Sequence, residues 1–253
     1  MSRSTLRPLQ ALFQGVQALR QQPQLAFGFS ALSCSVHLLG WALVALGEAS
    51  DSAVLTLMLR GVGSVVYAGS LIWLIEGLTR IGLALSAGRA VRWRQLCRWH
   101  GRRSRDLALG LLNTGMALSA TAFAAFVAWS LTLFLLPGLN LAPALLGVMA
   151  MLAVALSQLF NPCLVLDQRI SPSQAFSRGW LLLRQQGAGA VGLAAVVLIT
   201  MLTPFVLGLL SEALVPGRSA IVTVALMVAA LPLLATTVTA AYRQLDPLRP
   251  AAR

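Results

Sequence analysis

The side chains that most often carry catalysis or bind metals, Asp, Glu and His, are few in this sequence and lie far apart. Its 253 residues include seven Asp and Glu residues and two histidines. Catalysis needs such groups in clusters that exchange protons, hold a metal ion or activate a nucleophile. The sequence has no HxxxH pair, paired carboxylates, glycine-rich phosphate loop or Ser–His constellation. We therefore expect a protein that is not an enzyme and that has no catalytic residue, metal site or cofactor.

Glu76 and Arg80 form the charged pair whose spacing indicates a specific interaction. Residues four apart lie on one side of a helix, so these two side chains can form an ion pair. One interpretation makes the pair a structural salt bridge at a membrane rim, worth roughly tenths of a kcal/mol if it is solvated. The other places it with Asn161 and Asp167 around a polar vestibule that opens to the cytoplasm. Asn161 fits a helix–helix hydrogen bond as well as a substrate path, so both interpretations stay open.

One histidine and the three cysteines favour structural rather than chemical roles. His37 lies in the middle of an apolar segment, where we expect a hydrogen bond to a neighbouring helix rather than a proton relay. Cys34, Cys97 and Cys163 are odd in number and far apart in the sequence. This spacing indicates neither a disulfide framework nor a zinc site, so three unpaired thiols are expected.

A basic segment, Arg89–Asp106, lies between two long apolar segments and contains seven arginines. Arginine in short loops is retained on the cytoplasmic side of a membrane, so this segment fixes the expected orientation. Trp93, Leu96 and His100 share one helical face, and the arginines at positions 94, 98, 102 and 105 share the opposite one, which predicts an interfacial amphipathic helix. The lipid-binding residues expected in this segment are Arg89, Arg92, Trp93, Arg94, Arg98, Arg102, Arg103 and Arg105.

The composition is that of an integral membrane protein. The chain is 58% hydrophobic and 10% charged, whereas soluble domains carry about 25% charged residues. Its net charge of +12 is carried entirely by arginine, and beside apolar segments this charge indicates anionic lipid headgroups rather than nucleic acid. The expected partners are therefore membrane lipids and another membrane protein, with no nucleic acid.

The apolar segments predict an all-α membrane bundle with six spans. At 1.5 Å per residue, about 20 apolar residues cross a hydrocarbon core of roughly 30 Å. The expected elements are an N-terminal amphipathic helix over 1–23, a membrane domain over 24–245 with spans at 25–46, 53–85, 107–136, 141–166, 188–214 and 220–242, and a tail over 246–253. With both termini cytoplasmic, seventeen of the nineteen arginines lie inside and only Arg60 and Arg218 outside.

Two further segments have the pattern of helices that lie flat at the membrane surface. In residues 1–23 the apolar side chains from Leu6 to Leu19 recur on one face, opposite glutamines. After the fourth span, Ser171 and Pro172 are a good helix start. The helix that follows carries Arg178 and Trp180, which we also expect to bind lipid. Together with the basic segment, these give three cytoplasmic interfacial helices.

Two stretches carry a family resemblance, GLTRIGLALSAGRAVRWRQL (Gly77–Leu96) and NPCLVLDQRISPSQAFSRGWLLLRQQGAGAVG (Asn161–Gly192). They resemble the YciC-like proteins and the membrane domain of glycerophosphodiester phosphodiesterases, six-helix bacterial membrane proteins. In that family an acidic residue after a proline-bearing fourth helix precedes a short amphipathic element. The matching positions here are Asp167, Ala175, Arg178, Trp180 and Leu182. The resemblance implies a fold in a prokaryotic inner membrane, with the membrane part only and no catalytic domain.

Three functions fit these features. The first is a non-catalytic membrane protein that organises lipid or a partner protein at the cytoplasmic face. The second is a carrier or lipid-translocating protein with a polar cavity among the second, fourth and fifth spans. The third is an accessory subunit of a lipid-headgroup enzyme.

Overall fold

The computed structural model describes residues 5–98, 101–139, 141–214 and 217–245, and in these residues every regular element is a helix. His100, which we had placed on the face of Trp93, lies outside the described residues. The elements, in chain order, are α1 (Pro8–Gln21), α2 (Pro23–Glu48), α3 (Ala53–Leu85), α4 (Trp93–Leu96), α5 (Gly101–Leu135), the short 3-10 helix η1 (Pro137–Leu139), α6 (Leu141–Ser157), α7 (Asn161–Gln168), α8 (Pro172–Gln185), α9 (Gly187–Leu214) and α10 (Ser219–Gln244).

Six stretches are long and apolar enough to cross a membrane, as predicted. They are α2, α3, α5, the consecutive pair α6 and α7, α9 and α10. The protein is thus an all-α multi-pass membrane protein. The fourth stretch is broken between Ser157 and Asn161, just before Pro162, whose ring cannot continue a regular helix from the preceding turn. Helix α5, the third of the spanning helices, begins at Gly101, six residues before the start that the sequence predicted.

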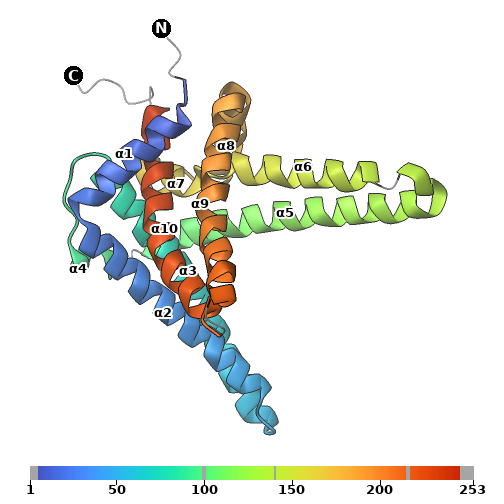
Figure 1. The fold of residues 1–253 in the computed structure, drawn as a ribbon, viewed down its shortest axis with the longest axis horizontal. Helices are drawn as coiled ribbons and strands as arrows, with labels where there is room; N and C mark the ends of the chain where they lie inside the picture. Colours follow the sequence, from blue (N-terminus) through green and yellow to red (C-terminus); the bar gives the residue numbers. More distant parts are fainter. Residues whose placement is uncertain (1–4, 99–100, 140, 215–216, 246–253) are drawn as a thin grey trace.

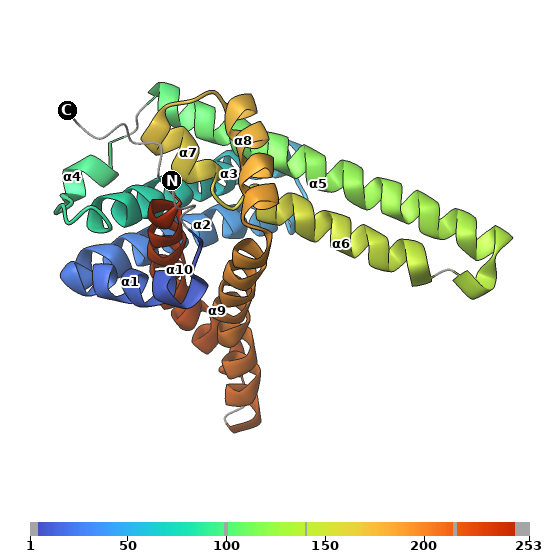
Figure 2. The ribbon, with the colours of Figure 1, turned by 90° about the horizontal axis from the view of Figure 1, so that it is seen from above.

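The spanning helices form three hairpins, α2–α3, α5–α6 and α9–α10, that diverge from a common junction (Figures 1 and 2). Helix α10 packs against α3 and α2, which joins two of the hairpins. The α5–α6 hairpin extends away from the others and touches them only near its base. Its tip is open on all sides, and the Phe134 side chain there is 91% exposed. Apolar surface of this extent needs an apolar surrounding, which a bilayer provides.

Close helix packing occurs at small residues, although not at every small residue that has the spacing of a packing face. In the α2–α3 hairpin, Gly40 lies against the backbone of Tyr67, so that a Cβ atom there would be 2.6 Å from the Tyr67 nitrogen. In the α5–α6 hairpin, Ala125 lies against Gly147. The alanines at positions 120, 124 and 128, which have the spacing of a packing face, are instead exposed. The packing face of α5 is therefore one residue further along.

Of the three segments in which interfacial helices were expected, two form helices, α1 and α8, and the basic segment does not form the expected helix. There α4 is a single turn, and Arg102, Arg103 and Arg105 belong to the first turns of α5. The predicted stripe of four arginines on one helix was therefore wrong. The physical reason is that two buried side chains, Val91 and Leu96, fix the segment to the junction and override its helical periodicity.

The contacts of the basic segment with the junction are specific. The indole N–H of Trp73 donates a hydrogen bond to the Leu96 carbonyl at 3.0 Å. The backbone N–H of Val91 donates to Gln22 Oε1 at 2.9 Å. Trp93 packs beside Phe29, with ring centroids 6.4 Å apart, and keeps 42% of its surface exposed. The segment is thus attached to α2 and α3, and the side chains of Arg89, Arg92 and Arg94 are exposed.

Helix α1 packs on α10 and α9 rather than presenting its whole apolar face to a membrane. The face in contact with α10 contains the small residues Ala11, Gly15 and Ala18. Leu9 and Phe13, one turn apart, are left exposed. Only this narrower apolar ridge of α1 is available to a bilayer.

Candidate functional site: the basic junction of the hairpins

The ends of the spanning helices that lie at the junction carry nearly all of the arginines. Among the described residues, only Arg60 and Arg218 lie towards the tips of the hairpins. Arg60 is paired with Glu48 at 3.3 Å, and both side chains are at least half exposed. The other described arginines lie on α1, α4, α8, the connecting segments and the junction ends of α3, α5 and α10. The molecule therefore concentrates its positive charge at the junction rather than at the three hairpin tips.

Glu76 is the buried acid of the junction. It is 4% exposed and forms an ion pair with Arg80, one turn further along α3, at 2.5 Å. Its second carboxylate oxygen accepts a hydrogen bond from Ser104 Oγ of α5, also at 2.5 Å, and Ser104 is fully buried. A hydrogen bond to a charged, buried carboxylate is stronger than one between neutral groups. Because Glu76 and Ser104 are buried, the Glu76–Arg80 pair is not a solvated salt bridge at the membrane rim. Through Ser104, the pair joins α3 to the first turn of α5.

Asp167 joins a different pair of helices, α7 and α10. Its Oδ2 atom accepts hydrogen bonds from Tyr242 Oη at 3.3 Å and from Arg243 at 3.4 Å. Gln168 donates to Tyr242 Oη at 3.0 Å and accepts from Arg178 of α8. These contacts join the end of α7 to the end of α10.

Asn161 closes the break between α6 and α7. Its amide donates to Gln158 Oε1 at 3.1 Å, and Gln158 donates in turn to Ser157 Oγ and to the Phe176 carbonyl of α8. All three polar side chains from 157 to 161 in this group are buried. The network supplies polar partners where the helix is interrupted.

The structure therefore brings Glu76 and Arg80 together and places Asn161 and Asp167 in two other networks. Each network joins helices, and neither of the two cavities at the junction is lined by these four residues. One cavity, of about 460 Å³, lies among glutamines of α1 and the ends of α3 and α10.

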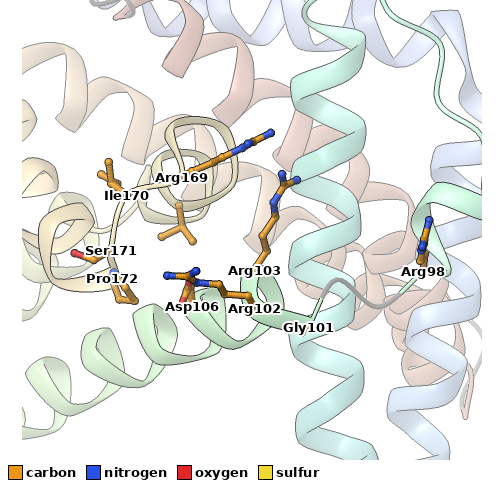
Figure 3. A pocket seen from close by; sticks show the side chains of 10 residues that line it. Arg98, Gly101, Arg102, Arg103, Asp106, Arg169, Ile170, Ser171 and Pro172 are labelled. Atoms are coloured by element: carbon orange, nitrogen blue, oxygen red, sulfur yellow. The ribbon is translucent and has the colours of Figure 1, made fainter.

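The second cavity, of about 940 Å³, lies between the first turns of α5 and the link from α7 to α8 (Figure 3). Its charged lining consists of Arg98, Arg102, Arg103, Arg169 and Asp106. The first three arginines were expected from the sequence to bind lipid, but Arg169 was not. The sequence does contain an indication of this role. Arg169 directly follows the end of the fourth span, in the stretch DQRISPS, and therefore lies at the same membrane surface as the start of the third span.

The remaining expected lipid-binding residues are placed as follows. Arg89, Arg92 and Arg94 are exposed on the basic segment, and Arg105 is exposed on α5. On α8, Arg178 is exposed and Trp180 is half-buried. Ser171 caps α8 by accepting a hydrogen bond from the Gln174 N–H, which confirms the predicted start of that helix.

The expectation for His37 is confirmed. Its Nδ1 atom lies 3.1 Å from Ser70 Oγ of α3, and its ring stacks on Tyr67 with centroids 4.0 Å apart. Cys34, Cys97 and Cys163 are free thiols, as predicted, and only Cys97 is exposed.

Comparison of the chain with protein-family models, curated proteins and solved structures finds no match.

Proposed function

We propose that this chain is a non-catalytic protein of the prokaryotic inner membrane, with both termini in the cytoplasm, that organises anionic lipid at the cytoplasmic face. The observation that supports this is the distribution of unpaired arginine. Within the described part of the chain, no acidic residue forms an ion pair with any of the seven arginines of 89–105. Their charge is available to a negatively charged surface.

The positive-inside rule gives the cationic junction a cytoplasmic location. The inner leaflet carries anionic lipid, and each arginine near such a surface contributes about 1 kcal/mol of attraction. Trp93 and Trp180, both partly exposed, suit the headgroup region beside these arginines. Lipid alone is then sufficient to hold the basic segment on the membrane.

The test compares the basic segment in neutral and anionic bilayers. The protein is reconstituted in nanodiscs of phosphatidylcholine with or without phosphatidylglycerol, and cleavage by proteinase K at residues 86–98 is followed by mass spectrometry. We expect protection only with phosphatidylglycerol. Replacement of Arg89, Arg92 and Arg94 by Gln should remove this protection without changing the helix content.

The matched control replaces Arg60 and Arg218 by Gln. These arginines lie towards the hairpin tips, so their loss should leave the protection of the basic segment unchanged. Equal cleavage of the wild-type segment in both kinds of nanodisc would contradict the proposal and favour a soluble acidic partner.

A further inference from the structure

The 940 Å³ cavity has an excess of positive charge that the protein does not neutralise. Four arginines and one aspartate line it, and in the described part of the chain none of these five side chains has a hydrogen bond or an ion pair with another residue. Arg103 and Arg169 extend toward one another in Figure 3, while Arg98 lies apart at the right of the view. Like charges held together repel, and a bound anion relieves that repulsion.

Arg169 ends α7 in the left-handed backbone conformation. Its φ and ψ angles are 56° and 32°, and it is the one non-glycine residue with positive φ among those that the structure describes. This left-handed conformation is unfavourable for a residue with a Cβ atom. It is fixed from both sides, by the Gln168–Arg178 hydrogen bond and by the cap of α8 at Ser171.

The cavity also has an apolar part. Val165, Ile170 and Pro172 line it together with the arginines. The apolar run of α5 starts at Leu107, four residues after Arg103, which is about 6 Å along a helix. A cavity this close to the start of a span lies at the depth of lipid headgroups. Its volume is in the range of roughly 300–1,000 Å³ that suits small organic ligands, and it exceeds what a lone phosphate ion needs.

We infer that this cavity binds the phosphate ester of an anionic phospholipid, with Arg102, Arg103 and Arg169 on the phosphate oxygens. The planar guanidinium group matches phosphate with two parallel hydrogen bonds, which makes arginine suited to this role. The apolar residues then contact the glycerol and the first acyl carbons. This inference rests on the proposed function and adds to it one defined site, which the exposed arginines at positions 89, 92 and 94 do not provide.

The experiment measures phospholipid binding by delipidated protein in mild detergent. Phosphatidylglycerol is titrated and the retained lipid is counted by native mass spectrometry. We expect one tightly held molecule per chain. Arg102→Gln with Arg169→Gln should weaken its affinity by roughly 25-fold, which is fivefold for each arginine at about 1 kcal/mol each. The control pair, Arg60→Gln with Arg218→Gln, removes the same charge at the hairpin tips, away from the cavity and the basic segment, and should change the affinity less than about twofold.

A single variant separates binding from folding. Arg169→Gly removes the guanidinium and supplies the residue that prefers positive φ. Its thermal unfolding midpoint should be equal to or above that of the wild type, while its affinity for phosphatidylglycerol falls roughly fivefold. An unchanged affinity in this variant would overturn the inference.

Two further arms identify the source of the phosphate and separate this inference from the proposed function. If inorganic phosphate or glycerol 3-phosphate binds as tightly as phosphatidylglycerol, the cavity is a phosphate site for a soluble ester rather than for lipid. Equal losses in the cavity pair and the control pair would refute the cavity site but leave the proposed function standing. If the wild type binds no phosphatidylglycerol while its basic segment is still protected in anionic nanodiscs, the cavity inference alone fails.

Discussion

At the scale of single residues, burial decides what each charged pair contributes. Glu76–Arg80 and Glu48–Arg60 are both ion pairs of one carboxylate with one guanidinium. The Glu76 side chain is 5% exposed, whereas the Glu48 side chain is 60% exposed. Removing one partner of a buried pair leaves an uncompensated charge in a medium of low dielectric constant, and an exposed pair has water as its substitute.

We therefore predict that Glu76→Gln lowers the free energy of unfolding by roughly 3–5 kcal/mol, because Arg80 loses its counter-charge in the buried junction. The control, Glu48→Gln, should cost less than about 1 kcal/mol. Both values are measured by denaturant titration in detergent micelles. A loss below about 1 kcal/mol for Glu76→Gln would show that water reaches this pair.

At the scale of elements, the helices of the junction are held where one backbone approaches another. Gly179 of α8 is the tightest such contact with a backbone atom. A Cβ atom at this position would lie 2.0 Å from the Ser157 carbonyl oxygen, at the end of α6. Because the neighbouring atom belongs to the backbone, a side chain at residue 179 would force α8 or the end of α6 to shift.

Gly179→Ala is accordingly predicted to displace α8 and to lower the free energy of unfolding by about 1–3 kcal/mol. Gly115→Ala in α5 is the control, because a Cβ atom there meets nothing within 4 Å. The control should be neutral or should stabilise by up to about 1 kcal/mol through helix propensity. Unfolding midpoints of the two variants measured side by side provide the comparison, and equal midpoints would contradict the tight contact.

At the scale of the whole molecule, the three hairpins give the protein two different ends. The connections within the hairpins are short and lie at the tips, while the connections between hairpins lie at the cationic junction. This arrangement makes the side of each segment relative to a membrane testable with one native thiol. Cys97 is exposed in the basic segment, and Asp51 lies in the turn between α2 and α3.

A membrane-impermeant maleimide should therefore label native Cys97 in inside-out vesicles and leave it unlabelled in intact cells. Asp51→Cys, in a chain with the three native cysteines replaced by Ser, should show the opposite pattern. Labelling is read by the mass shift of the purified protein. Reaction of Cys97 from outside intact cells would contradict a cytoplasmic junction.

The sequence by itself determined the spans and how the arginines divide between the two ends. Both depend on local properties, since an apolar run of sufficient length identifies a span and Ser171–Pro172 identifies a helix start whatever the rest of the chain does. The sequence also indicated the hydrogen bond of His37, because a lone polar side chain in an apolar segment needs a partner.

Only the tertiary structure decided which polar groups meet. Glu76 and Ser104 are 28 residues apart in the chain, and Asp167 and Arg243 are 76 apart. No local pattern specifies such contacts, because they depend on how the hairpins pack at the junction. For the same reason, the buried Val91 and Leu96 replaced an expected helix in the basic segment by a single turn, and packing brought Arg169 to the cavity beside Arg103.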